Sequence, residues 1–136
     1  MTPDYQSVPA PKSSKVMIWI GRVLSALCVL LLLFSGYMKV TRNPAAVEGF
    51  KAFGFPDGVL VTIGIVEIAC ALIYAIPQTS VLGAILLAGY LGGATATHVR
   101  AGDGQFFGPP IIGAVLWLGL FLRDARVRAL IPLKRK

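Results

Sequence analysis

The sequence predicts an all-α membrane protein: a four-transmembrane-helix bundle with a short interfacial helix between spans one and two. Of its 136 residues, 56% are hydrophobic and 14% are charged, whereas soluble domains carry about 25% charged residues. The mean hydropathy is +0.75. The apolar residues gather in four runs, each close to the roughly 20 residues that a helix needs to cross a bilayer. We therefore expect one transmembrane domain over residues 16–128, between a disordered tail at 1–15 and a basic tail at 129–136.

The four expected spans lie at about residues 16–40, 58–76, 80–99 and 106–125. The first run is too long for the apolar core of a signal peptide and lacks a small-residue cleavage pattern, so we expect it to be a span. The segment at 44–53 is too short to cross, and its apolar residues fall along one side, which favours a helix at the membrane interface. Proline and short polar residues at 77–80 predict a tight turn, and hence an antiparallel hairpin of spans two and three.

The lysines and arginines predict the orientation. With four crossings, both tails and the turn at 77–80 share one side of the membrane. That side carries nine of these residues and the other side four, which favours both termini in the cytoplasm. The nine are Lys12, Lys15, Arg22, Arg123, Arg126, Arg128, Lys134, Arg135 and Lys136, and the four are Lys39, Arg42, Lys51 and Arg100. Because these residues collect beside the apolar runs, the net charge of +7 does not indicate nucleic-acid binding.

Glu67 interrupts the second apolar run well inside the expected span. At 1.5 Å per residue it lies about 13 Å below the outer boundary. An unpaired charge near the bilayer centre costs roughly 2.5–3.5 kcal/mol on insertion scales, so Glu67 is either protonated or paired with a cation inside the bundle. Arg22 of the first span, roughly 10 Å away in depth, is the preferred partner. Lys39, which approaches from the outer end, is the alternative.

Helical spacing predicts which face of each span points inward. Gly64, Glu67, Ala71 and Tyr74 recur at three- and four-residue steps, and polar residues of the first and third spans follow similar stripes. The spacing therefore predicts a polar cavity that opens to the outer side and is lined by Lys39, Glu67, Tyr90, Thr97 and His98. Glycines let helix backbones approach closely, and we expect this role for Gly36, Gly64, Gly89, Gly92 and Gly93. Lys39 and His98 also have a simpler explanation. Both lie near the outer ends of their spans, where a polar side chain can reach the membrane interface and needs no further role.

Two explanations of this intramembrane polar site stay open. A buried ion pair that fixes helix packing accounts for the charged residues. A ligand, quinone or proton site also accounts for them, because ionisable groups inside a membrane are usually functional. We expect no metal site, since one histidine beside one glutamate lacks the second set of ligands of a diiron or haem centre. Cys28 and Cys70 are best explained as small buried hydrophobic residues, with a redox pair as the alternative.

A series of short motifs runs from about residue 21 to residue 132. The motifs are Gly21-Arg22, Ser35-Gly36-x-x-Lys39, Gly54-Phe55-Pro56, Gly64-x-x-Glu67, Tyr90-Leu91-Gly92-Gly93-Ala94, His98-x-Arg100, Pro109-Pro110-Ile111, Trp117 and Leu122-Arg123. In order and spacing this set resembles the DoxX-like family of small four-span bacterial membrane proteins, and the resemblance implies a location in the bacterial inner membrane.

The resemblance implies a link to membrane redox systems. Some members of the family are associated with thiosulfate–quinone oxidoreduction and others with the maturation of periplasmic redox enzymes. We therefore expect an accessory or scaffold subunit linked to quinone or thiol and sulfur chemistry; a quinone-binding oxidoreductase or, less favoured, a small transporter is the alternative. The expected partners are the lipid bilayer, an oxidoreductase subunit or a second copy of the chain. The sequence carries no cofactor-binding motif, and a quinone is the one cofactor that the resemblance suggests.

Overall fold

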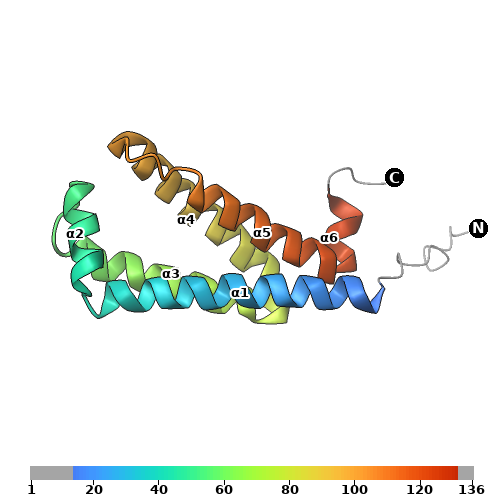
Figure 1. Cartoon of the computed structure of the whole chain (residues 1–136). Coiled ribbons are helices and arrows are strands. Elements are labelled where there is room, and N and C mark those ends of the chain that lie inside the picture. Colours follow the sequence, from blue (N-terminus) through green and yellow to red (C-terminus); the bar gives the residue numbers. More distant parts are fainter. Residues whose placement is uncertain (1–13, 132–136) are drawn as a thin grey trace, which may run out of the picture.

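The computed structural model describes residues 14–131, and the regular structure in that part of the chain is entirely helical (Figure 1). Four long helices are α1 (Lys15–Val40), α3 (Val59–Ala75), α4 (Ser80–Ala101) and α5 (Gly108–Arg123). Three short elements connect or follow them: α2 (Pro44–Ala52), the 3-10 turn η1 (Pro77–Thr79) and α6 (Ala125–Leu130). The tails expected at 1–15 and 129–136 fall largely on residues 1–13 and 132–136, which lie outside the described residues.

The helix ends follow from the local sequence. The Ser14 hydroxyl accepts a hydrogen bond from the Met17 N–H at 3.1 Å and starts α1. Asn43 does the same for α2, its side-chain oxygen accepting from the Ala45 N–H at 3.0 Å. Gly102 ends α4 at its C-terminus. It adopts the left-handed conformation with φ 66°, which glycine reaches without strain.

The fourth long helix ends earlier than the expected boundary at residue 125. Asp124 has an extended backbone with φ −123° and ψ 109°, so α5 ends at Arg123. The Asp124 carboxylate then accepts the Arg126 N–H at 2.9 Å and starts the separate helix α6. The expected helix continued through this aspartate. The only sequence signal for the break is the preference of aspartate for the position that caps a helix.

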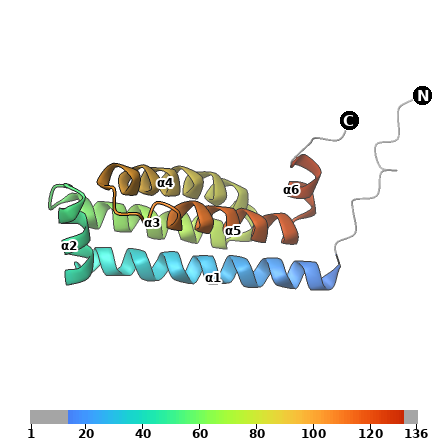
Figure 2. The same cartoon turned by 45° about the horizontal axis from the view of Figure 1, so that its top comes forward.

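The four long helices pack in a closed order. α1 contacts α3 and α5, and α4 contacts the same two helices from the other side. Figure 2 shows these helices side by side, with α2 across one end and α6 at the other. In Figure 1 the α4–α5 pair is inclined to the α1–α3 pair, so that the two pairs diverge toward the α2 end. The side chains of Tyr74, Leu87, Leu116 and Leu120 are fully buried between them.

The outer surface of the four long helices is apolar. Large hydrophobic side chains that are 56–64% exposed occur on all four of them, including Trp19, Leu27, Leu30, Phe34, Ile65, Ile85 and Ile111. Soluble monomers rarely expose apolar surface on this scale. Among the described helices, α1 and the segment Pro77–Ala101, with 26 and 25 residues, are long and apolar enough to cross a membrane. The helices α3 and α5 are apolar but shorter, with 17 and 16 residues.

Candidate functional site

A buried ion pair joins α1 to α3. The Lys39 ammonium donates to the Glu67 carboxylate at 2.7 Å, and the two side chains are 14% and 3% exposed. The same ammonium donates to the Ser35 hydroxyl, one turn earlier on α1, at 2.6 Å. Its third proton has only a long contact of 3.5 Å, with the Ser35 carbonyl. Both charges are therefore neutralised locally, and the ammonium keeps limited capacity for another acceptor.

Two glycines allow this pair to form. Gly36 and Gly64 are buried where α1 crosses α3. A β-carbon on Gly64 would lie 2.8 Å from the β-carbon of Lys39 and 2.9 Å from the Gly36 carbonyl oxygen. A β-carbon on Gly36 would lie 3.1 Å from the Gly64 carbonyl oxygen. Because no side chain separates the two backbones, the Lys39 side chain reaches Glu67 directly across the interface.

The ion pair forms part of the wall of a cavity of about 580 Å³. Lys39 and Ser35 come from α1, Glu67 from α3, and Tyr90, Thr97 and His98 from α4, while α5 contributes Pro109 and Ile112. The remaining wall is apolar, and its leucines, isoleucine, glycines and phenylalanines outnumber the polar groups. A cavity of this size with a few convergent polar groups is typical of a small-molecule site.

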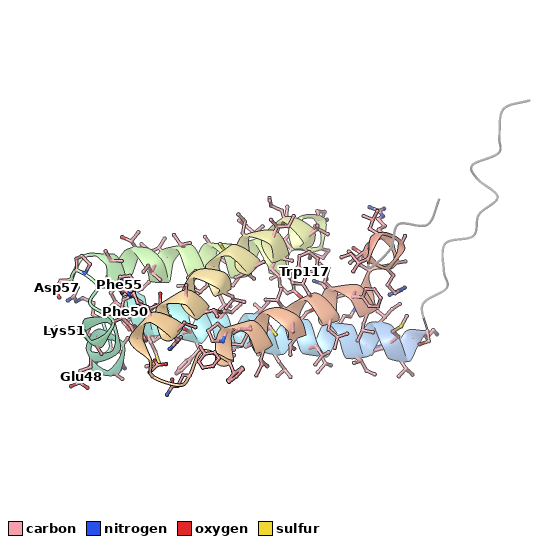
Figure 3. All side chains as sticks on the ribbon, turned by 90° about the horizontal axis from the view of Figure 1, so that it is seen from above. Glu48, Phe50, Lys51, Phe55, Asp57 and Trp117 are labelled. Carbon is pink, nitrogen blue, oxygen red and sulfur yellow. The ribbon has the colours of Figure 1, made fainter. Side chains whose placement is uncertain are left out.

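Aromatic side chains line the α2 end of the cavity. Phe50 of α2 and Phe53 and Phe55 beyond it line the cavity, with the rings of Phe50 and Phe55 5.2 Å apart. Figure 3 shows Phe50 on the side of α2 that faces the long helices and Glu48 on the far side. The Arg100 guanidinium donates to the Phe53 carbonyl at 2.7 Å, and the Phe53 ring meets the His98 ring edge-on at 5.0 Å. These contacts hold the end of α2 against α4.

His98 has a partner outside the cavity. Its Nδ1 lies 2.6 Å from the Asp103 carboxylate in the loop after α4. The pKa of Asp103 lies below its ordinary value, first because the Gln105 N–H donates to the carboxylate and second because of the contact with His98. The histidine therefore stands between the loop and the mouth of the cavity, and the pair carries no net charge when the histidine is protonated.

The structure brings together five of the six polar residues expected at this site and leaves one out. Lys39, Glu67, Tyr90, Thr97 and His98 all line the cavity. The preferred pairing of Glu67 with Arg22 is wrong: Arg22 is exposed near the opposite end of α1, with its guanidinium 5.9 Å from the Trp19 ring. The difference in depth is too large, and Lys39, the alternative partner, reaches Glu67 instead.

The expected packing glycines also divide into two groups. Gly36 and Gly64 lie at the α1–α3 contact, whereas Gly89, Gly92 and Gly93 are exposed on α4. Within residues 14–131, a β-carbon on any of the last three would meet no neighbouring atom within 4 Å. Their expected role in helix packing is therefore wrong in this chain, because α4 turns these glycines away from the core that it forms with α3 and α5.

A second polar cluster lies at the α6 end and was not expected from the sequence. The Tyr74 hydroxyl donates to the Leu116 carbonyl at 2.6 Å and lies 2.9 Å from the Ser25 hydroxyl. The Arg123 guanidinium donates to Ser25 at 3.1 Å and to Ser80 at 3.2 Å, and lies 5.3 Å from the Tyr74 ring centre. The inward spacing of Tyr74 was the available signal; Arg123 was counted only as a basic residue of the cytoplasmic end.

Both cysteines are core residues. Cys28 and Cys70 are buried, with 6% and 8% of their surface exposed, and both thiols are free. They pack in the same hydrophobic cluster as Leu32, Ala71 and Tyr74. Among the described residues, no group of three or more histidine, cysteine or acidic side chains is placed to hold a metal ion.

An apolar surface around long helices, with the polar groups turned inward, defines a helical membrane protein. The model of the DoxX-like family matches residues 23–120, and the chain belongs to that family. The match runs from α1 into α5, so the ion pair and all the residues that line the cavity lie inside it. Searches of curated proteins and of solved structures gave no match. The resemblance seen in the sequence motifs is thereby confirmed.

Proposed function

We propose that the chain crosses the bacterial inner membrane four times, with both termini in the cytoplasm. The two long apolar helices support this topology, and η1 connects α3 to α4 as a tight hairpin. The helices α3 and α5 are close to the lower limit of about 17 residues for a span. The start of α1 and α6 share one end of the molecule, and that end carries Lys15, Arg22, Arg123, Arg126 and Arg128.

Reporter fusions test this topology. Alkaline phosphatase fused after Gly102, in the loop between α4 and α5, is expected to be active, because the enzyme folds only outside the cytoplasm. The same reporter fused after residue 131 is expected to be inactive. The reverse pattern would overturn the orientation, and activity at both positions would overturn the number of spans.

Within this topology we propose that the chain is an accessory subunit of a membrane redox system and binds a quinone at the cavity beside Glu67. One observation carries the proposal: the ion pair, although shielded from the surface, borders a cavity of about 580 Å³ whose wall is mainly apolar. If the ion pair only fixed two helices, other side chains would be expected to surround it. Beside a cavity, part of the hydrogen-bonding capacity of the Lys39 ammonium stays unused.

The residues of the cavity suit a quinone ring. The Lys39 ammonium would donate to one carbonyl oxygen, and Tyr90 offers a hydroxyl group from the facing helix, whereas the Thr97 hydroxyl already donates to the Gly93 carbonyl at 2.9 Å. The apolar wall would enclose the ring, and Glu67 would hold the lysine in place. A bound quinone would supply electron transfer, and the chain itself would bind and orient it. Since the sequence holds no cofactor-binding motif, the electrons would come from a partner subunit, as the family resemblance suggests.

Ligand binding by the purified chain tests the proposal. Native mass spectrometry of the protein released from detergent micelles is expected to show one bound benzoquinone per chain. Glu67→Gln is expected to weaken binding about tenfold, because Lys39 loses the carboxylate that positions it; a tenfold change corresponds to about 1.4 kcal/mol. Glu48→Gln, on the far side of α2, is the matched control and is expected to bind like the wild type. An unliganded wild-type protein at saturating quinone would overturn the proposed site.

The role of a partner is tested separately. Crosslinking in native membranes followed by purification is expected to recover an oxidoreductase subunit with the chain. Quinone reduction by the purified chain alone, with a simple electron donor, would instead identify it as the oxidoreductase itself.

A further inference from the structure

The wall of the cavity is bare on one side of α4. Gly89 and Gly93 line the cavity, are exposed, and lie near the middle of the 22-residue helix. In the described part of the chain, a β-carbon on either glycine would have open space within 4 Å. A position near the middle of an apolar helix faces the hydrocarbon rather than water when that helix crosses the bilayer. The bare side of the wall therefore faces lipid.

The bare side lies between α3 and α4. Leu91 is buried and its side chain lies 3.6 Å from the position of a β-carbon on Gly113 of α5. Two residues along a helix correspond to a rotation of about 200°, so Gly89 and Gly93 lie on the opposite edge of α4 from Leu91. α4 meets α3 at Gly83, and Gly93 lies about 80° around the helix from Gly83, on the side away from Leu91, so this edge borders α3. The cavity residues of α3 that face it are Ile63 and Glu67.

The divergence of the helix pairs explains the opening. Near η1, α3 and α4 touch so closely that a β-carbon on Gly83 would collide with the backbone of Tyr74. Farther toward α2 the pairs separate (Figure 1), and no side chain of α4 fills the widening space at Gly89 and Gly93. At the outer end, by contrast, α2 is held over the cavity by the contact of Arg100 with Phe53. The side opening is thus less obstructed than the outer mouth.

The chemistry of the wall limits the kind of molecule that fits. The Lys39 and Glu67 charges cancel, and His98 at the outer end is paired with Asp103. An anionic headgroup would be attracted by the Lys39 ammonium and repelled by the Glu67 carboxylate beside it. A cationic headgroup would be attracted by the carboxylate and repelled by the ammonium, so neither gains a net attraction. A neutral group with hydrogen-bonding oxygens can accept from Lys39 without paying for a separated charge. The apolar remainder of the wall and the lipid beyond it suit a hydrocarbon tail.

We propose that the cavity holds the neutral polar head of a membrane amphiphile, while its apolar tail leaves sideways between α3 and α4 across Gly89 and Gly93. This inference rests on the proposed quinone site and adds the direction of access and the class of ligand. Anionic phospholipids gain no net attraction from the cancelling charges, whereas neutral lipids with a small oxygen-bearing head remain suitable.

Two probes and two glycine variants test this inference on the full chain in detergent. The probes are a benzoquinone with a decyl tail and the same ring carrying only a methyl group. Gly93→Leu fills the opening and is expected to weaken binding of the tailed probe at least about tenfold, with little change for the methyl probe, because only the tail crosses residue 93. Gly92→Leu is the matched control: Gly92 is also exposed on α4 but does not line the cavity. Its binding of both probes is expected to match the wild type.

The outcomes separate the inference from the proposed function. Wild-type binding of both probes with no selective loss in Gly93→Leu would overturn the side opening and leave the quinone site standing. An equal loss in Gly92→Leu would also overturn it, since the effect would then come from α4 in general. If neither probe binds to the wild-type protein, the quinone site and the inference are both overturned. Displacement of the tailed probe by excess phosphatidylglycerol would overturn the neutral ligand class. Gly89→Leu repeats the test one turn away if Gly93→Leu does not fold.

Discussion

At the α6 end of the molecule, glycine contacts and a cluster of hydroxyl groups hold the four long helices together, whereas at the α2 end the same helices separate around a cavity. Near α6, Gly21, Gly83 and Gly119 each lie directly against a neighbouring helix. Near α2, Gly89 and Gly93 lie against nothing within 4 Å in the described chain. Glycine therefore serves close packing at the α6 end, whereas at the α2 end Gly36 and Gly64 pack α1 against α3 and the glycines of α4 leave open space.

The polar groups differ between the two ends in the same way. Near α6, the hydroxyls of Ser25, Tyr74 and Ser80 and the Arg123 guanidinium satisfy one another within the packed helices. Near α2, two opposite charges pair beside a cavity. A network enclosed by packing contributes rigidity, and an ion pair at a cavity remains accessible to a ligand. The enclosed polar network therefore lies at the α6 end, and the cavity proposed to bind a ligand lies at the α2 end.

The largest expected effect is the loss of the ion pair. Glu67→Leu leaves the Lys39 ammonium buried without its carboxylate, and removing one partner of a buried pair costs about 3–5 kcal/mol. Thermal unfolding of the purified protein in detergent is expected to show a clear fall in Tm. The double variant Lys39→Met with Glu67→Leu is the control and is expected to recover much of the loss, because an apolar pair leaves no charge unpaired. An unchanged Tm in Glu67→Leu would show that the pair contributes nothing to stability.

Alanine in place of two glycines of the same helix compares the ends directly. Gly83→Ala places a β-carbon against the Tyr74 backbone, and overpacking of this kind costs about 1–3 kcal/mol. Gly93→Ala meets open space and is expected to be neutral or to stabilise by up to about 1 kcal/mol, because alanine favours a helix more than glycine does. Thermal unfolding under identical detergent conditions measures both. Equal losses of stability in the two variants would remove the distinction between a packed and an open end.

Much of the fold could be predicted because apolar length and proline position are local properties of the sequence. Each of the four expected spans corresponds to a helix, and their ends differ by one or two residues at most positions. The interfacial segment expected at 44–53 appears as α2, Pro44–Ala52. The end of α5 was missed because a single capping side chain, Asp124, outweighs the helical preference of the residues around it.

The composition of the candidate site was predictable, but its pairing was not. Helical periodicity places Glu67, Tyr90 and Thr97 on inward faces, and the structure lines a cavity with them. The choice between Arg22 and Lys39 depends on how far α1 is shifted along α3, which is a tertiary property. For the same reason the sequence could not separate Gly83, which packs, from Gly93, which does not.

The smallest expected effect comes from Arg22, the residue that the sequence favoured as the partner of Glu67. Arg22 is exposed near the α6 end and its guanidinium contacts the Trp19 ring rather than an acid. Arg22→Ala is therefore expected to change the free energy of unfolding by no more than about 0.5 kcal/mol, as for other exposed substitutions. Thermal unfolding beside Lys39→Ala makes the comparison, since Lys39→Ala leaves the Glu67 carboxylate buried without a partner and is expected to destabilise strongly. A large loss of stability in Arg22→Ala with a small loss in Lys39→Ala would show that Glu67 pairs with Arg22, and the charged site would then lie at the α6 end.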